Sequence, residues 1–453
     1  LDPVTKNITL VLQKSALEYH TPLIYCFYEE EAVYYVDKEY NLYTFYFETK
    51  KSEFIANLGA EIQALDKISS IVKYHDSFFV GLMMDGVLVL ERRKDSGEYQ
   101  IQTLPINSGA FSLIKDRFQD VVWIGTDGQG VYLYSNPLYS IKSVVLSNYT
   151  EKIERPVRAL LLDKERTFWI GTKGNGILKI FAYEVDKNLS DCRSEILTTS
   201  NSGLGSNAVY CIGESNRNLL WIGDEEGLNF YSYRERRIKK LPLWIDNEEF
   251  KYIHDIYETE DSELWLASVG MGVVRARIGG TPDYPVLEDV QRYVVNGGEF
   301  DSNYFFTICK GDTLNLLFGN MGHGVFRFNN TTNGLEPLTT HKYENMNLNK
   351  VVPIMKDEAD NYLIGTTYGV IKYASENSYQ LFNAKDGFLN STIHAILRHS
   401  PDNFWLSTNQ GLINFDTKRN VFRSYGLGDG LKVVEFSDGA SYRDPQTGTL
   451  FFG

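Results

Sequence analysis

The side chains that most often carry catalysis are scattered along this sequence rather than grouped. Only seven histidines occur, at positions 20, 75, 254, 323, 341, 394 and 399, so a metal cluster would have to be assembled from distant segments. No P-loop, no GxGxxG turn in a βαβ unit, no GxSxG elbow and no HExxH motif is present. We therefore expect no metal, no cofactor and no catalytic residue in this region.

Carboxylates are abundant, and a glycosidase needs only two of them at a suitable separation. The sequence leaves such a pair open. Most acidic residues nevertheless stand in expected turns between strands, where a short carboxylate side chain makes the turn and stays solvated. We interpret four residues in this way: Asp163, Asp261, Asp357 and Asp402.

Aromatic residues are the second candidates for chemistry, because a flat ring offers an apolar face on which a sugar can stack. The chain has 30 Tyr, 26 Phe and 6 Trp. Trp244 stands in the segment LPLWIDNEEF (241–250), which we expect to be a loop between an outer strand and the next inner strand. Such a loop position makes Trp244 a candidate sugar platform. Packing of the indole within its own loop is the alternative.

Six segments share the pattern V-x-x-I, with related apolar residues at its first and last positions. The second position holds mostly polar or aromatic side chains within otherwise apolar strands: Arg158, Tyr210, His254, Phe306, Val352 and His394. In a radial fold with these strands innermost, that position would lie near the axis and face a ligand. Packing between neighbouring sheets with a satisfied polar tip is the alternative. The candidate ligand-binding residues are thus Trp244, Arg158, Tyr210, His254, Phe306 and His394.

One repeated unit of roughly 45 residues supplies the elements that would position these side chains. Its clearest copies are VWIGTDGQGVYLY from Val122, FWIGTKGNGILKI from Phe168, LWIGDEEGLNFY from Leu220 and LWLASVGMGVVRA from Leu264. A small residue marks each copy, at positions 81, 125, 171, 223, 267, 319, 365, 407 and 453, with intervals of 42 to 52 residues. A degenerate copy lies one period earlier, near Val36.

Each copy predicts four short strands. In the copy around Gly171 they cover 157–163, 168–172, 176–181 and 195–199, with a glycine turn between the second and third. Both faces of the first two strands are apolar, which favours sheets packed on both sides in a β-propeller. Five tryptophans stand two residues before the small residue and are expected to pack between sheets: Trp123, Trp169, Trp221, Trp265 and Trp405.

The pattern W-[IL]-G-T-x-x-x-G-[ILV], preceded by segments such as GLGSNAVYCI (203–212) and GFLNSTIHAI (387–396), resembles the two-component regulator propeller repeat. The resemblance covers at least residues 78–453, and 426–453 looks like the last blade of such a propeller. It implies the periplasmic sensor region of a Bacteroides-type hybrid two-component system. In that family two seven-bladed propellers typically precede a tyrosine-rich domain, a membrane helix and a histidine kinase.

The predicted fold is therefore all-β, with one seven-bladed propeller and part of a second, built of four-stranded antiparallel blades. Seven small-residue positions counted back from Gly453 reach Gly171, which predicts a second propeller over 151–453 with a truncated last blade. Residues 1–150 would hold the final blades of a first propeller, although the copy at Gly125 could instead open the second ring. Because the chain starts at Leu1 without Met and ends inside an expected strand, we expect a longer protein.

Charge and composition exclude some partners. The net charge is −14 and no dense Lys/Arg block is present, so nucleic acid, which needs clustered cations, is not an expected partner. No apolar stretch approaches the length of a membrane span, so any membrane contact would come from a segment outside this chain. Cys211 and Cys309 stand in apolar runs and are expected to be buried thiols, while disulfide pairing stays open.

The resemblance implies a periplasmic ligand-sensing domain that binds an oligosaccharide and controls glycan-utilisation genes, in a receptor expected to be a homodimer. Two alternatives from other classes stay open. One is a propeller-fold polysaccharide lyase or glycosidase, and the other is a protein-docking scaffold, because propellers serve many functions.

Overall fold

The computed structural model describes residues 23–453 apart from 30–31, 48, 63–65, 94–95, 117–120, 135–140, 147–152, 185–190, 296–301, 312–315, 339–349, 359, 376–377, 387 and 389–391. The chain divides into two units, Leu1–Tyr139 and Ser140–Gly453. The predicted boundary between 150 and 151 falls outside the described residues and stays a proposal. The described residues contain no α-helix, and η3 (Ala384–Asp386) and η4 (Leu427–Asp429) are short 3-10 turns.

The first unit is a stack of three antiparallel sheets whose strands follow one another in chain order. The first two sheets each have four strands: β1 (Leu23–Glu29), β2 (Ala32–Asp37), β3 (Asn41–Tyr46) and β4 (Lys51–Asn57), then β5 (Ile68–Tyr74), β6 (Ser77–Leu82), β7 (Gly86–Arg92) and β8 (Tyr99–Thr103). The third sheet consists of β9 (Ala110–Lys115), β10 (Val122–Thr126) and β11 (Val131–Tyr134).

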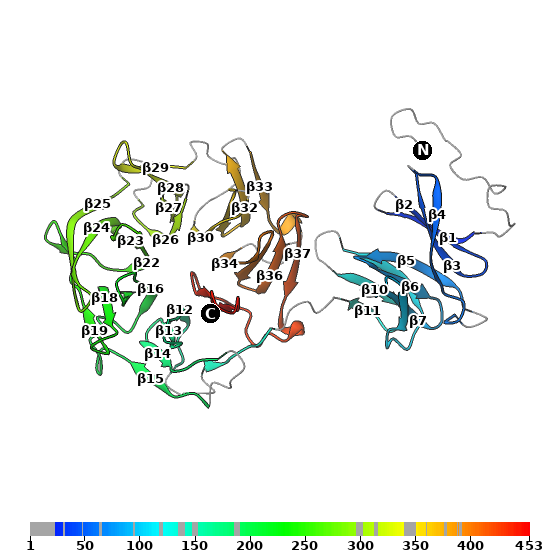
Figure 1. Cartoon of the computed structure of the whole chain (residues 1–453), viewed down its shortest axis with the longest axis horizontal. Helices are drawn as coiled ribbons and strands as arrows, with labels where there is room; N and C mark the ends of the chain where they lie inside the picture. The colour runs from blue at the N-terminus through cyan, green and yellow to red at the C-terminus, as the bar shows by residue number, and fades with distance from the viewer. Residues whose placement is uncertain are drawn as a thin grey trace. The chain divides into compact units, whose positions relative to one another are not determined.

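The second unit is a ring of sheets around a central axis, which Figure 1 shows end-on. Its first three four-stranded sheets are β12 (Val157–Leu162), β13 (Phe168–Thr172), β14 (Ile177–Ile180) and β15 (Ser194–Leu197); β16 (Val209–Glu214), β17 (Leu219–Asp224), β18 (Gly227–Ser232) and β19 (Arg237–Lys240); and β22 (Ile253–Glu258), β23 (Glu263–Ser268), β24 (Gly272–Thr281) and β25 (Tyr284–Tyr293). The short hairpin β20 (Trp244–Ile245) and β21 (Glu248–Glu249) lies between the second and third sheets in the chain.

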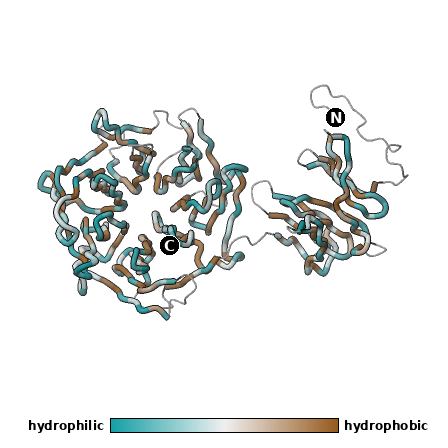
Figure 2. Tube along the Cα trace, viewed as in Figure 1, coloured by the Kyte–Doolittle hydropathy of each residue, from teal (hydrophilic) through white to brown (hydrophobic). Residues whose placement is uncertain are grey.

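Three more four-stranded sheets continue the ring. They are β26 (Phe305–Lys310), β27 (Leu316–Asn320), β28 (Gly324–Asn329) and β29 (Gly334–Pro337); β30 (Val351–Lys356), β31 (Tyr362–Thr366), β32 (Gly369–Ser375) and β33 (Ser378–Phe382); and β34 (Ile393–Ser400), β35 (Asn403–Thr408), β36 (Gly411–Asp416) and β37 (Val421–Tyr425). The first strand of each sheet contacts the first strand of the next, so these strands are innermost. Figure 2 shows that the hydrophobic segments gather on the inner part of the ring, as the burial patterns of these strands also indicate.

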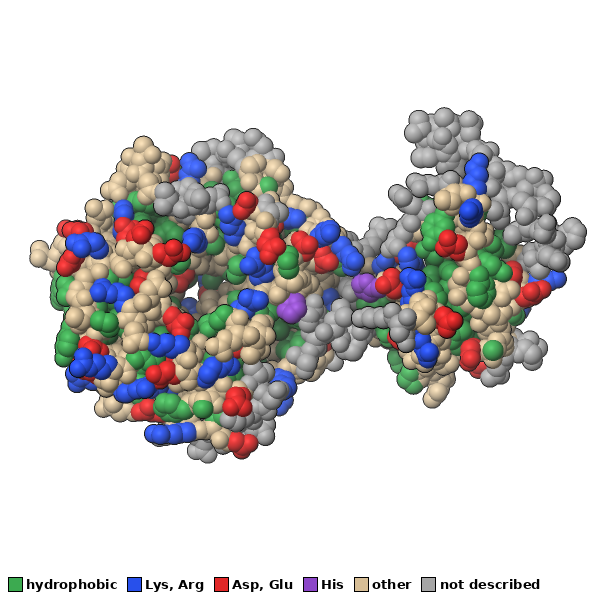
Figure 3. Space-filling view, in the orientation of Figure 1, with side chains coloured by type: hydrophobic (Ala, Val, Ile, Leu, Met, Phe, Trp, Pro, Cys, Tyr) green, Lys and Arg blue, Asp and Glu red, His purple; other side chains and the backbone are tan. Residues whose placement is uncertain are grey.

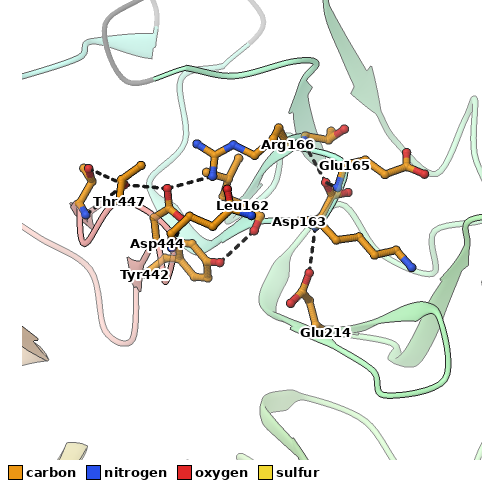
Figure 4. A network of polar contacts seen from close by, with 12 residues as sticks. Leu162, Asp163, Glu165, Arg166, Glu214, Tyr442, Asp444 and Thr447 are labelled. Carbon is orange, nitrogen blue, oxygen red and sulfur yellow. Dashed lines mark hydrogen bonds and ion pairs between the residues drawn. The ribbon is translucent and has the colours of Figure 1, made fainter.

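A two-stranded sheet, β38 (Ser441–Arg443) and β39 (Leu450–Phe452), closes the ring as its seventh member, because β38 contacts both β34 and β12. Figure 4 shows the polar part of this closure, where the Arg166 guanidinium donates to Asp444 at 2.9 Å. The Tyr442 hydroxyl donates to the Leu162 carbonyl at 2.9 Å. The Phe451 ring packs 4.9 Å from that of Phe168. The predicted all-β propeller fold is thereby confirmed.

The small residue that marks each repeat has a steric cause. At Gly171 an added Cβ would lie 2.9 Å from Val209, the first residue of the next inner strand. At Gly365 it would lie 2.9 Å from Ile393, which holds the same place in its own sheet. Real Cβ contacts are essentially never shorter than 3.0 Å. At these two positions only glycine fits without a shift of the neighbouring sheet, and the copies that carry Ala267 and Ser407 keep the side chain small at the same place.

The tryptophan of the repeat packs between sheets in the second unit. Trp169, Trp221, Trp265 and Trp405 are all buried, as predicted. Trp169, for example, joins one apolar cluster with Val209 and other residues of the following sheet. The prediction is wrong for Trp123, which is 38% exposed. It lies on the face of β10 opposite Val122 and Ile124, and among the described residues of the first unit no further sheet covers that face.

The turn carboxylates divide into two groups. Asp261 and Asp402 are exposed, as expected. Asp163 and Asp357 are buried, so their interpretation as solvated turn residues is wrong. The Asp163 carboxylate accepts the Thr167 backbone N–H at 2.8 Å and the Trp169 indole N–H at 2.8 Å. A carboxylate that both makes its turn and caps the buried indole is better placed inside than in water.

Candidate functional site

A β-bulge recurs near the start of the inner strands of the second unit. In β12 the pairing register shifts between Val157 and Ala159, and in β16 it shifts between Val209 and Cys211. Four further inner strands, β22, β26, β30 and β34, show the shift at the equivalent place. A bulge leaves one residue out of the ladder and re-aims its side chain. The unpaired residues include the whole set that the V-x-x-I pattern singled out: Arg158, Tyr210, His254, Phe306, Val352 and His394.

Five of these six residues line one cavity of about 210 Å³ at the centre of the second unit: Arg158, Tyr210, His254, Phe306 and Val352. The aliphatic side chains two positions further along the inner strands, such as Leu160 and Ile212, line the same cavity. Figure 3 shows the hollow in the middle of the ring. The structure thus brings the inner-strand candidates together around the axis.

Three aromatic rings from consecutive sheets form an arc along one side of the cavity. The Tyr210 ring is stacked on the His254 imidazole with ring centroids 4.2 Å apart. The His254 imidazole meets the Phe306 ring edge-on at 5.3 Å. The arc offers apolar ring surface beside polar tips, which is the combination that binds sugars and other amphipathic ligands.

A charged cluster completes the circle on the other side, around Asp438 in the segment between β37 and β38. The Asp438 carboxylate contacts the Lys350 ammonium at 2.5 Å and the Arg158 guanidinium at 3.7 Å. It also lies 2.7 Å from His394 Nδ1. Lys350 lies over the Phe306 ring at 4.9 Å and Arg158 over the Tyr210 ring at 5.8 Å. The charged cluster and the aromatic arc are therefore in contact at both ends. All seven sheets or their connections contribute to this circle.

The environment fixes the charges of the circle. Burial, followed by the positive charge of Arg158, lowers the pKa of the His254 imidazole to about 3, so His254 is neutral at physiological pH. Burial alone would raise the pKa of the Asp438 carboxyl. The hydrogen bond with His394 and the charge of Lys350 outweigh that effect and hold the pKa below its usual range. Asp438 is therefore a carboxylate.

Sequence reasoning missed Lys350, Asp438 and Asn409. Asn409 lies in the turn between β35 and β36, and its side-chain oxygen contacts His394 Nε2. Lys350 directly precedes an inner strand, one position before the start of the V-x-x-I pattern, so extending that pattern backwards by one residue would have found it. Asp438 stands 15 residues before Gly453, as Lys350 stands 15 residues before Gly365, so the same extension of the repeat would have found it although its sheet has only two strands.

Because neighbouring strands in each sheet are antiparallel, all inner strands of the second unit begin on the same face of the ring, and the circle lies near that face. Each inner strand begins on the face that also carries the turns between second and third strands and the connections from one sheet to the next. Three tyrosines exposed by more than a third lie on these segments: Tyr252 and Tyr304 directly before inner strands, and Tyr368 in a turn. These three tyrosines therefore lie on the same face of the ring as the bulged residues that line the cavity.

Trp244 lies apart from the circle. It occupies the hairpin β20–β21, where it pairs with Glu249, and its side chain is 64% exposed. The neighbouring Leu243 and Phe250 are buried and anchor the hairpin. The connection belongs to the same face of the disc as the cavity mouth, but Trp244 does not line the cavity.

Other parts of the described structure show fewer features of a ligand-binding site. The bulged positions in the first strand of each sheet of the first unit hold Ile24, Ser69 and Phe111, none of which is charged. A hollow of about 500 Å³ in that unit has no aromatic or cationic residue among its lining residues. The described residues contain no group of three or more His, Cys, Asp or Glu that could hold a metal ion. They also contain no helix long and apolar enough to cross a membrane.

Comparison with known proteins gives relatives and structural neighbours, while no protein-family model matches the chain. "Histidine kinase P4" from Formosa agariphila is 21% identical over 311 residues, which are 66% of this chain and 21% of the relative. The extracellular domain of the putative hybrid two-component system BT3049 from B. thetaiotaomicron has a TM-score of 0.58 and 20% identity, and the match covers all of this chain and 63% of that one. The extracellular domain of the putative hybrid two-component system BT4673 from the same organism has a TM-score of 0.56 and 17% identity over 96% of this chain and 56% of that one.

A virginiamycin B lyase from Staphylococcus aureus is similar over 69% of this chain and 94% of its own, with a TM-score of 0.51 and 14% identity. At these identities the structural likenesses show the fold. The predicted resemblance to the extracellular domains of hybrid two-component systems is confirmed, since two such domains and a histidine kinase are among the similar proteins. The chain spans about a fifth of the curated relative and 56–63% of the two solved domains.

Proposed function

We propose that this chain is the ligand-sensing part of the periplasmic region of a hybrid two-component histidine kinase, and that it binds an oligosaccharide at the axial cavity of its second unit. The similar domains of known structure are described as extracellular domains of putative hybrid two-component systems, which supports both the location and the sensor class. Control of glycan-utilisation genes and homodimerisation of the full receptor belong to the same proposal.

One observation carries the ligand site: the circle formed by Arg158, Tyr210, His254, Phe306, Lys350 and Asp438 around the axis. Sheets that pack only for stability would need apolar side chains at the bulged positions, as the next layer of Leu160 and Ile212 shows. Instead, aromatic and charged groups converge on a cavity. The cavity is smaller than the roughly 300–1,000 Å³ of drug-sized sites, so we expect it to hold about one sugar unit of a longer chain. The remaining units would rest on the rim tyrosines.

Signalling follows from how the site is assembled. A ligand shifts a conformational equilibrium only by binding its two states differently. A sugar that contacts residues from several sheets favours the arrangement in which those sheets present their side chains together. We propose that the resulting bias is transmitted to the receptor through movement between whole propellers or subunits.

Calorimetry with a panel of plant and host oligosaccharides tests this function. We expect binding by the wild-type chain and a loss of affinity in Tyr210→Ala. Tyr284→Ala is the matched control, because Tyr284 is an exposed tyrosine on the outer strand β25. Retained binding in Tyr210→Ala would move the site away from the axis, and a wild-type chain that binds nothing in the panel would contradict the sensor proposal.

A lyase is the second candidate, favoured by the His394–Asp438 pair at 2.7 Å on a fold also found in virginiamycin B lyase. A histidine oriented by a carboxylate is a common general base. Here, however, Nε2 of His394 contacts Asn409 and Nδ1 contacts Asp438, so neither nitrogen is directed at the cavity. The sensor proposal expects no product from any glycan in the panel. Product formation that disappears in His394→Gln would favour the lyase.

A further inference from the structure

The charges at the axis are not balanced. Two cations, Arg158 and Lys350, share one carboxylate, that of Asp438. Asp255 also borders the cavity, but its carboxylate oxygens accept the backbone N–H groups of Ile256 at 2.8 Å and Ile308 at 2.6 Å. They are thus directed at the backbone of β22 and β26. Charges of both signs lie just outside the circle: the positive charge of Lys173 lowers the pKa of His254, and the negative charge of Glu225 raises the pKa of Tyr210.

The donors of Arg158 are not satisfied by Asp438 alone. Its Nε is buried and has no hydrogen-bond partner. The 3.7 Å from its Nη1 to Asp438 is an ion pair but is longer than a hydrogen bond. A guanidinium carries five N–H donors in a planar fork, and leaving such a donor buried and unsatisfied is costly. A group with two or more anionic oxygens matches that fork in a way that a neutral hydroxyl cannot.

Lys350 adds the second contact. It comes from the fifth sheet, whereas Arg158 comes from the first, and both meet at Asp438. The aromatic arc of Tyr210, His254 and Phe306 lies beside them. An anionic group placed between the two cations would therefore have its sugar ring against aromatic surface. A cavity of about 210 Å³ holds one such unit.

We infer that the oligosaccharide sensed at the axis is acidic, and that a carboxylate or sulfate on one sugar unit binds between Arg158 and Lys350. This inference rests on the proposed function and specifies its ligand class. Asp438 then competes with the ligand anion, because its carboxylate already forms ion pairs with both cations. Its replacement by a neutral isostere should tighten the binding of an acidic sugar rather than weaken it.

The test is calorimetric titration of the whole chain with matched trisaccharides: galacturonate against galactose, glucuronate against glucose, and 6-sulfated galactose against galactose. We expect one acidic member to bind at least tenfold more tightly than its neutral partner. The carboxylate and sulfate arms identify which anion is bound. Lys350→Met and Arg158→Gln should each lower the affinity for the acidic member about 10- to 100-fold, the range for losing a charge-assisted hydrogen bond.

Two further variants separate recognition from folding. Lys350→Arg keeps the positive charge and should retain the acidic preference, and Asp438→Asn should bind the acidic member more tightly than wild type. Arg237→Met, which removes an exposed arginine of the outer strand β19, should change nothing. Neutral trisaccharides binding as tightly as acidic ones would overturn the inference while leaving the sensor function intact. A preference that survives both Lys350→Met and Arg158→Gln would also overturn it. A panel in which no saccharide binds would contradict the proposed function and the inference together.

Discussion

Truncation of Trp221 tests whether the repeated tryptophans hold the ring together. The indole is fully buried, at 0% exposure, in the cluster that joins the second and third sheets. Its N–H donates to Oε2 of Glu258 at 2.7 Å, across the boundary between those sheets. Trp221→Ala removes both the ring and this donor. We expect a loss of about 3–5 kcal/mol in unfolding free energy, the usual cost of deleting a buried aromatic side chain.

Trp221→Phe separates the two contributions. The phenyl ring keeps most of the apolar contact but leaves the Glu258 carboxylate without the indole donor, and its other oxygen, Oε1, is already buried without a partner. An unsatisfied buried acceptor costs about 1–3 kcal/mol, so the loss should be smaller than for alanine. Trp244→Ala is the matched control, because the same residue type is 64% exposed there.

Chemical denaturation monitored by far-UV circular dichroism measures these differences without depending on tryptophan emission. The expected order of stability is wild type and Trp244→Ala together, then Trp221→Phe, then Trp221→Ala. Equal losses for Trp244→Ala and Trp221→Ala would refute the argument that burial between sheets sets the cost. An unfolding free energy of Trp221→Phe equal to that of the wild type would show that the hydrogen bond to Glu258 makes no net contribution to stability.

Three further predictions follow from the axis and the ring closure. Because the folded pKa of His254 is about 3 and the unfolded value about 6.5, the folded state is favoured fully above pH 6.5 and loses stability as the pH falls towards 3. The loss at pH 5 should be about 2 kcal/mol relative to pH 8, and urea titrations of His254→Gln should lack this component; an identical pH slope in both proteins would contradict it. Asp444→Asn weakens the bond from Arg166 that closes the ring and should lower stability by about 1–3 kcal/mol, and an unchanged melting temperature would show that the ring closes without this pair. Trp244→Ala should weaken oligosaccharide binding, as expected for an exposed platform on the face of the cavity mouth; normal binding would restrict the site to the axis.

The repeated elements could be predicted from the sequence because their causes are local. The strand expected at 168–172 is β13, and the one expected at 157–163 is β12, which ends one residue earlier. The small residue of each repeat was visible because a Cβ at Gly171 would collide with the next sheet. The inner-strand candidates could be recognised for a similar reason. A polar side chain in an otherwise apolar strand is out of place in the core, and the β-bulge turns it towards the axial cavity.

What the sequence did not reveal depends on the relation between repeats. Trp123 carries the same local pattern as Trp169, yet it is exposed, because burial requires a following sheet and not a motif. Asp163 stands in a turn like Asp402, yet it is buried, because the indole of Trp169 needs an acceptor. Asp438 stands at the same repeat position as Lys350, 15 residues before the small residue of its copy. The repeat does not reveal that these two side chains meet, because their contact joins the fifth sheet to the segment that closes the ring.

Asp438 connects the closure of the ring with the chemistry of the axis. The segment that carries it leads directly into β38, and the N–H of Gly439 donates to the His394 carbonyl at 2.9 Å. The same segment thus binds the sixth sheet through its backbone, the first sheet through Arg158 and the fifth through Lys350. A ligand anion that binds Arg158 and Lys350 would compete with Asp438 for both cations, while the backbone bond to His394 and the contacts of the hairpin with the first sheet remain. In the proposed sensor, occupancy of the axis would therefore change how the segment that closes the ring is held, and a difference in this contact between two states of the propeller would give the ligand a differential affinity for them.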